Sequence, residues 1–300
     1  MQILMLGGTG SIGSAVIMQL LRRGQGVTAL ARSDLSARKL ASMGAAVLPG
    51  DIRMPEPWLS AVDQVDGVIH AATDFGSDMA ATDQVLLDAL LPRLSANGRN
   101  QLLLYTGGCW LYGATGDSVA TELYPFDALP AFAWMLPAIQ RVFATPGIRG
   151  VVIHPAMVYE GVEGVFSRFA HDARSIGRIC IVGDERTRWP LVHRHDLAAL
   201  YVLAMEGSMP GQSYNAAAVA GLPVGLIARA IARRFGADET PMLRDVNAVA
   251  AELGEWARGY GLDQQMSGDK AQRELGWRPV WREPLAELTS QDLYTGSPIQ

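Results

Sequence analysis

The chain has 300 residues, of which 49% are hydrophobic and 18% are charged, which is enough apolar material for two domains or for one large α/β domain with an appended lobe. The formal net charge of −5, with no run of lysine and arginine, excludes a basic face for nucleic acid. No apolar stretch approaches the roughly 20 residues that cross a bilayer, and the apolar N-terminus lacks a basic signal region, so we expect a cytoplasmic protein without membrane contact.

The first half of the chain alternates short apolar runs with helical patterns, which predicts βαβ units and a parallel sheet. We expect six strands, over residues 2–6, 27–31, 45–48, 65–70, 101–105 and 150–154. Helices are expected over residues 14–21, 58–62 and 83–94. The predicted fold class is therefore α/β, with a doubly wound parallel sheet.

Beyond residue 155 helical patterns dominate, with a clear helix over 222–235 that Gly236 ends. Thr240-Pro241 indicates a second helix start, an N-cap followed by proline at the first helical position. We expect two interleaved lobes: 1–155 with about 178–207 in the doubly wound domain, and about 156–177 with 208–300 in a smaller, mostly helical substrate lobe. Cys109 and Cys180 lie far apart among apolar neighbours and are expected to be reduced thiols.

The segment after the first strand is rich in glycine and runs directly into the first helix. Gly7 permits a tight turn, Gly10 lets backbone N–H groups approach a pyrophosphate, and Gly13 lets the helix pack close to the strand. The helix N-terminus adds free donors and a positive dipole end. This strand–turn–helix context predicts a dinucleotide-binding loop, with contacts from Gly7, Thr9, Gly10, Ser11, Ile12 and Gly13.

The loop, with its order Gly-Gly-Thr-Gly-x-x-Gly, resembles the fingerprint of the extended short-chain dehydrogenases/reductases, a group of NAD(P)-dependent epimerases, dehydratases and reductases. Similar segments follow in the family's order at 50–52, 68–72, 105–113, 154–159, 191–198 and 275–279. The resemblance covers nearly the whole chain and implies an NAD(P)-binding Rossmann fold with a smaller C-terminal lobe. It also implies further cofactor contacts from Asp51, Ile52, Ala71, Ala72, Thr73, Thr106 and Pro155.

The end of the second strand bears on the choice of nicotinamide cofactor. NAD sites usually carry an acidic residue there, whereas this sequence has Arg32, whose guanidinium suits a 2′-phosphate. Arg38 and Lys39 follow and add positive potential. In the alternative interpretation Arg32 is solvated and Asp34 binds the ribose of NAD. We expect NADP, with NAD as the alternative.

The acid/base pair of the resembled family, a tyrosine with a lysine four residues later, is missing. The only lysines are Lys39 and Lys270, and neither follows a tyrosine by four. Phe132 falls near the tyrosine position and Leu136 near the lysine position, while Gly108 replaces the strand-five serine. A positioned acid/base contributes roughly 10²–10⁴ in rate, so the family's usual carbonyl-reductase mechanism is not expected.

Several side chains remain as candidates, each with a structural alternative. Tyr112 and Thr106 are candidate catalytic groups, although Tyr112 also suits a packing role. Trp110, Tyr112, Trp134 and Arg188 are candidate substrate-lining residues; the tryptophans suit core packing equally, and Arg188 a solvated loop.

Three histidines are further candidates for a functional role. His154 is expected to be a hydrogen-bonded structural histidine. His193 and His195 have the spacing of a metal pair but no evident third ligand, so we expect no metal.

These observations favour an atypical NADP-dependent oxidoreductase that acts on a small organic substrate and works as a monomer or homodimer. Two alternatives stay open: a non-catalytic NADP(H)-binding regulator or sensor, and a non-redox isomerase or lyase on the same fold.

Overall fold

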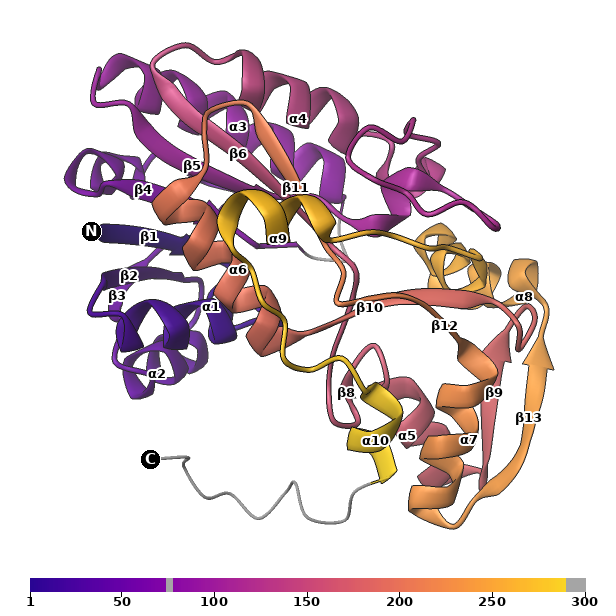
Figure 1. Cartoon of the computed structure of the whole chain (residues 1–300). Helices are drawn as coiled ribbons and strands as arrows, with labels where there is room; N and C mark the ends of the chain where they lie inside the picture. The colour runs from indigo at the N-terminus through magenta and orange to yellow at the C-terminus, as the bar shows by residue number, and fades with distance from the viewer. Residues whose placement is uncertain (74–77, 290–300) are drawn as a thin grey trace.

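The computed structural model describes residues 1–73 and 78–289. At its centre lie seven strands, β1 (Gln2–Leu6), β2 (Gly26–Ala31), β3 (Ala46–Pro49), β4 (Gly67–His70), β5 (Gln101–Thr106), β6 (Ile148–Pro155) and β11 (Gln212–Ala216). They form one parallel sheet with the order β11-β6-β5-β4-β1-β2-β3 (Figure 1). The order reverses between β1 and β4, which is where ligands bind in such sheets. The predicted Rossmann fold is confirmed.

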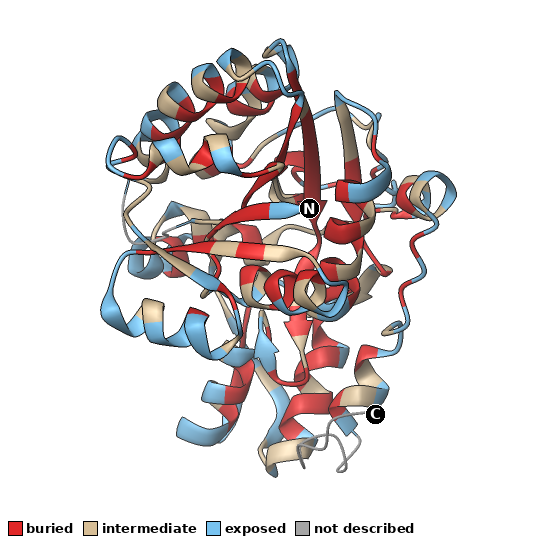
Figure 2. Ribbon diagram, turned by 90° about the vertical axis from the view of Figure 1, so that its left-hand side faces the viewer, coloured by how far each residue is buried: buried red, intermediate tan, exposed pale blue. Residues whose placement is uncertain are grey.

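Helices cover both faces of this sheet because its buried strands are apolar on both sides. In β1, Ile3 and Met5 pack toward one face, while Leu4 and Leu6 pack toward the other. The first face carries α1 (Ser11–Arg22), α2 (Asp34–Ser42) and α6 (Arg194–Gly207). The second carries α3 (Met79–Ala96), α4 (Met135–Ala144) and the 3₁₀ helix η1 (Leu59–Gln64). Figure 2 shows the buried residues following the central strands and the inner faces of the helices.

The smaller lobe contains two further sheets. The first has the order β12-β10-β7-β8, from β7 (Met157–Glu160), β8 (Glu163–Gly164), β10 (Arg188–His193) and β12 (Val219–Pro223). The second pairs β9 (Arg178–Val182) with β13 (Asp238–Arg244). The lobe's helices are α5 (Ser167–Ser175), α7 (Val224–Phe235), α8 (Val246–Leu253), η4 (Glu255–Gly261), α9 (Asp269–Leu275) and α10 (Pro284–Thr289). Two short 3₁₀ turns, η2 (Cys109–Tyr112) and η3 (Pro130–Phe132), lie between β5 and α4.

Two details differ from the sequence-based expectation. Thr240-Pro241 does not begin a helix but lies within β13, where the pairing with β9 is interrupted between Asp238 and Met242. Proline lacks the N–H of a ladder bond, so an interrupted stretch of strand accommodates it. In addition, residues 212–216, expected in the substrate lobe, form the edge strand of the large sheet, and residues 178–182, expected in the doubly wound domain, pair with β13.

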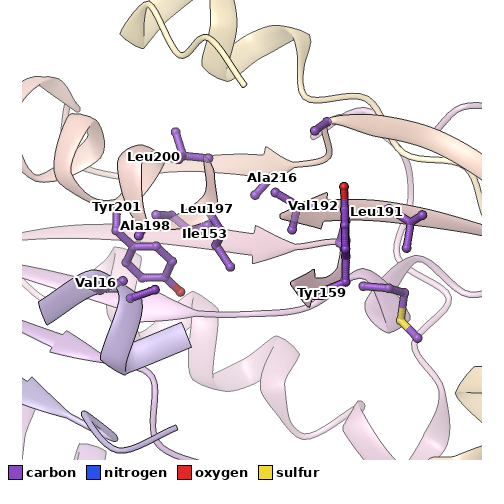
Figure 3. Close-up of a cluster of buried hydrophobic side chains, with 14 of the residues drawn as sticks. Val16, Ile153, Tyr159, Leu191, Val192, Leu197, Ala198, Leu200, Tyr201 and Ala216 are labelled. Carbon is purple, nitrogen blue, oxygen red and sulfur yellow. The ribbon is translucent and has the colours of Figure 1, made fainter. Parts of the chain in front are cut away.

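One hydrophobic cluster runs without a break from the large sheet into the smaller lobe. Figure 3 shows part of this cluster, with Val16 and Tyr201 on one side of the view and Tyr159 and Leu191 on the other. The C-terminal segment is tied to the same region, because the Asp196 carboxylate accepts hydrogen bonds from the backbone N–H groups of residues 280 and 281 at 3.0 and 2.8 Å. Across the described ranges, no helix combines the length and the apolar character needed to cross a membrane.

Candidate functional site

The glycine-rich loop between β1 and α1 has the geometry of a phosphate cradle. Gly7 has a φ of +85°, and a Cβ there would lie 2.5 Å from the Ala71 carbonyl oxygen. A Cβ at Gly13 would lie 2.2 Å from the Gly7 carbonyl oxygen, so only glycine allows α1 to approach the loop this closely. At Gly10, by contrast, a Cβ would meet only the Gly7 oxygen, at 3.5 Å. The loop is therefore tight on the protein side and open on the cavity side.

The N-terminus of α1 supplies the chemistry that this cradle needs. Gly10 is the N-cap and has no side chain to occupy the first N–H groups of the helix, which are left available for an anion. The Lys39 ammonium donates to the Thr9 carbonyl oxygen at 2.7 Å and holds the loop from the α2 side. These features fit the pyrophosphate of a dinucleotide.

A cavity of about 380 Å³ opens in front of this loop. Its walls contain the predicted cofactor residues Gly7, Thr9, Gly10, Ser11, Ile12, Arg32, Asp51, Ile52, Ala71, Ala72 and Thr73. Asp34 is not a wall residue, which disfavours it as the ribose ligand. Sequence reasoning missed five wall residues: Leu30, Ser36, Gly50, Arg53 and Thr82.

Asp51 and Arg53 form the ion pair of this wall. The Arg53 Nε lies 3.1 Å from each Asp51 carboxylate oxygen. These hydrogen bonds hold the pKa of the Asp51 carboxyl below its usual value, and Arg32 adds to the effect through its charge. The carboxylate is therefore ionised at neutral pH, between two arginines.

A second cavity of about 390 Å³ adjoins the first. The two share the wall residues Ser11, Ile12, Ala71, Ala72 and Thr73. The second cavity also contains the predicted residues Thr106, Trp110, Trp134 and Pro155, together with Phe132 and Tyr260. Gly13 lines neither cavity and acts through its packing against Gly7. The two chambers thus meet at the strand ends beside the switch point of the sheet.

A buried polar network forms part of the second cavity's wall. The Asp83 carboxylate contacts His70 Nε2 at 2.8 Å and accepts a hydrogen bond from the Tyr105 hydroxyl at 3.0 Å. Burial raises the pKa of Tyr105 far above its usual value, and the negative charge of Asp83 adds to the shift. Sequence reasoning missed this network, although His70 and Tyr105 stand opposite each other on neighbouring strands and Asp83 falls in a predicted helix.

The structure changes the interpretation of both candidate catalytic groups. The Thr106 hydroxyl donates to the His70 carbonyl oxygen at 2.7 Å and lies 2.6 Å from the Tyr201 hydroxyl, so its single proton is already engaged. Tyr112, predicted to line the substrate site, lies outside both cavities and donates to Asn215 Oδ1 at 2.8 Å. Its position on a 3₁₀ turn aims the ring into the core.

Arg188, the other predicted substrate-lining residue, also lies outside both cavities. Its guanidinium contacts the Asp263 carboxylate at 2.9 and 2.6 Å and Asp117 at 3.1 Å. Its role in the structure is to hold β10 to two loops.

His154 is buried, but it is not the hydrogen-bonded histidine that the sequence indicated. Within the described residues neither ring nitrogen has a hydrogen-bond partner of good geometry. Burial lowers the pKa of His154 to about 4, outweighing an opposing effect of the Gly108 backbone. The ring packs between Tyr112 and Phe126, with centroid separations of 5.8 and 5.7 Å.

His193 and His195 do have a third polar neighbour, contrary to the sequence-based expectation. Pairing of β7 with β10 brings Glu160 alongside, and its Oε1 lies 3.4 Å from His195 Nε2. The Arg194 Nε contacts the other Glu160 carboxylate oxygen at 2.6 Å, so the positive charge of the guanidinium already neutralises this carboxylate. We therefore describe it as an ion-pair cluster and assign no metal to it.

The positions of the missing acid/base pair are filled by apolar side chains. Phe132 lies in η3 and Leu136 in α4. Lys39 holds the phosphate loop, and Lys270 donates to the backbone of β11 at 2.9 Å. Neither lysine therefore replaces the lost pair.

Comparisons with known proteins agree with this geometry. A model of the NAD dependent epimerase/dehydratase family matches residues 3–217. An uncharacterised protein of Schizosaccharomyces pombe is 28% identical over 297 residues, covering 97% of this chain and 99% of the relative. The 2-alkyl-3-oxoalkanoate reductase of Stenotrophomonas maltophilia is 28% identical over 224 residues, covering 70% and 67%. Among solved structures, a dTDP-glucose 4,6-dehydratase of Streptomyces venezuelae with NAD bound covers 96% of each chain, with a TM-score of 0.80 and 21% identity, a likeness of fold.

Proposed function

Because the chain belongs to the NAD dependent epimerase/dehydratase family, we propose that it is an NADP-dependent oxidoreductase that acts on a small organic substrate. The observation that carries this proposal is the pair of adjoining cavities, one built around a phosphate loop and the other around apolar side chains. A dinucleotide in the first cavity would bring its nicotinamide toward the shared wall.

The residues that would hold the cofactor follow from the walls of the first cavity. The loop over residues 7–13 would bind the pyrophosphate, and Asp51 and Ile52 would contact the adenosine. Ala71, Ala72, Thr106 and Pro155 would flank the nicotinamide. When bound, the nicotinamide supplies a hydride donor or acceptor.

NADP is favoured over NAD by the charge around the adenosine end of the cavity. Arg32 and Arg53 line it and provide cationic donors for a 2′-phosphate, with Ser36 beside them. Asp34, the alternative ribose ligand, is not in the wall, and the Asp51 carboxylate in the wall is paired with Arg53, which leaves Arg32 as the main cationic group for the phosphate.

The protein's part in the reaction is to bind, orient and exclude water, and we assign no side chain as the proton donor. The hydroxyl proton of Thr106 is engaged with His70, and Tyr112 is remote from the cavity. Water therefore handles the proton in this proposal.

A second candidate function is a cofactor-binding sensor without turnover. The loss of the tyrosine–lysine pair favours it, and non-redox isomerase or lyase chemistry is open for the same reason. Apart from the segments 178–182 and 212–216, the lobes as bounded by sequence stay predictions, as do the cytoplasmic location and the monomeric or dimeric state. The two unpaired buried cysteines fit a reducing compartment.

Calorimetric titration with NADPH and NADH tests the proposal. Wild-type protein should bind NADPH more tightly than NADH. In Arg32→Ala the affinity for NADPH should fall by roughly 10- to 100-fold, the equivalent of about 1.5–3 kcal/mol for a charge-assisted hydrogen bond, with little change for NADH. Arg22→Ala, an exposed arginine at the C-terminal end of α1 outside the cavity, is the matched control.

Binding of neither nucleotide would refute the proposal. An equal loss of affinity for NADPH and NADH in Arg32→Ala would refute the choice of NADP. Tight NADPH binding without consumption of the cofactor by any acceptor would favour the sensor.

A further inference from the structure

The second cavity has walls suited to a flat, apolar compound. Trp110, Phe132, Trp134 and Tyr260 place aromatic rings around it. The Trp110 ring centroid lies 5.3 Å from that of Phe132 and 5.8 Å from that of Tyr260, so the three rings form one connected surface. Such a surface stacks on a planar ring.

The charge of the cavity excludes anionic substrates. Its described wall contains no lysine or arginine, and Asp83 places a buried carboxylate there. Arg168 packs over the Tyr260 ring, 4.8 Å from its centroid, but does not line the cavity. Arg188, which might have received a phosphate or carboxylate, is bound to Asp263 and Asp117. A ligand in this cavity is therefore not an anion.

The hydroxyl groups restrict the kind of acceptor further. Ser11 and Thr73 belong to the wall shared with the cofactor cavity. The Thr106 proton is donated to the His70 carbonyl oxygen and the Tyr105 proton to Asp83. A simple ketone becomes a strongly basic alkoxide on reduction and needs a proton from the protein at that moment. A quinone becomes the anion of a phenol, and phenols ionise near pH ~10, so water can protonate it afterwards.

We propose that this cavity binds an uncharged quinone as the electron acceptor, an inference that rests on the proposed oxidoreductase function. The quinone gains two electrons and one proton as a hydride from NADPH, which leaves as NADP⁺, and a second proton comes from water. The product is the hydroquinone, and the sum is quinone, NADPH and one proton giving hydroquinone and NADP⁺.

Two matched ligand pairs test the proposal, in binding and in turnover. A neutral naphthoquinone should bind at least about tenfold more tightly than the same ring bearing a sulfonate, because the buried Asp83 repels the added charge. Cyclohexanedione, which has two ketones but cannot become aromatic, should support at least about tenfold slower NADPH oxidation than benzoquinone, after subtraction of the enzyme-free rate.

One variant connects the result to the aromatic wall. Trp134→Leu should weaken naphthoquinone binding by about tenfold, whereas Phe143→Leu, an exposed aromatic residue on α4 outside the wall, should not. Equal binding of the neutral and sulfonated rings would overturn the proposal, as would faster turnover of the diketone.

These results are separable from those of the cofactor test. NADPH binding with reduction of the diketone but not of the quinone overturns only the quinone proposal. Failure to bind NADPH overturns the oxidoreductase function, while calorimetric titration with the two naphthoquinones still shows which ligand the cavity accepts.

Discussion

Substitution of Gly13 by alanine would place one methyl group where the structure has no room. Its Cβ would lie 2.2 Å from the Gly7 carbonyl oxygen, and the backbone around Gly7 is confined on its other side by Ala71. To remove this clash the loop must move by about 1 Å, because carbon and oxygen atoms in ordinary contact are more than about 3 Å apart. That movement would also disturb the 3.1 Å hydrogen bond from Gly10 N–H to Gly7 O.

The expected net effect is a loss of about 1–3 kcal/mol of unfolding free energy. Overpacking costs about 1–3 kcal/mol and a weakened hydrogen bond about 1 kcal/mol, while alanine in a helix returns up to about 1 kcal/mol relative to glycine. NADPH affinity should fall at the same time, because the displaced loop is the proposed phosphate cradle.

Gly10→Ala is the informative comparison because its Cβ would meet only one atom, at 3.5 Å, and it faces the cavity. We expect a loss of no more than about 1 kcal/mol in urea unfolding, because alanine is a poorer N-cap than glycine, with at least about tenfold weaker NADPH binding. Unchanged stability of Gly13→Ala would refute the packing argument, and wild-type affinity in Gly10→Ala would refute the placement of the phosphates.

Three further predictions concern groups outside the loop. Burial lowers the pKa of His154 to about 4 from an ordinary value of 6.5, so below pH ~6.5 the unfolded chain takes up a proton that the folded chain excludes. The free energy of unfolding, measured in urea, should therefore fall by about 2 kcal/mol between pH 7 and pH 5. In His154→Leu this contribution to the pH dependence should be absent. Asp83→Leu leaves the His70 ring and the Tyr105 hydroxyl without their buried partner and should lower the free energy of unfolding by about 3 kcal/mol. Asp88→Asn, at an exposed position of the same helix, should change it little. Arg188→Ala should lower the thermal midpoint and leave the KM for an uncharged acceptor unchanged; a raised KM with an intact midpoint would return Arg188 to the substrate site.

The sequence predicted the sheet well because its strands carry local signals. Strand β1 begins and ends where the apolar run does, and the glycine spacing after it placed the loop at the N-terminus of α1. Helix α7 likewise ends at Gly236, whose φ of +66° is the left-handed conformation expected of a C-terminal glycine. Thr240-Pro241 misled because its local signal is that of a helix start, whereas pairing with β9, a contact distant in sequence, decides its structure.

The site was less predictable, since its geometry depends on contacts that the sequence does not display. Tyr112 follows the family pattern at the end of β5, yet a turn of 3₁₀ helix directs its hydroxyl to Asn215. The Arg188 guanidinium is suited to binding an anionic substrate. In the structure, however, it is hydrogen-bonded to the carboxylate of Asp263, a residue far along the chain. Glu160 joins His195 only through the pairing of β7 with β10.

The route of the chain between its two lobes limits how the protein can be divided. Strand β6 leads into β7 through the single residue Ala156, and the edge of β6 is covered by β11, which comes some 60 residues later in the chain. A fragment ending at residue 155 would lose both β11 and the α6 packing on α1, and would expose an unpaired strand edge prone to aggregation. The nucleotide loop and the aromatic cavity therefore cannot be transplanted to another protein as the N-terminal half alone.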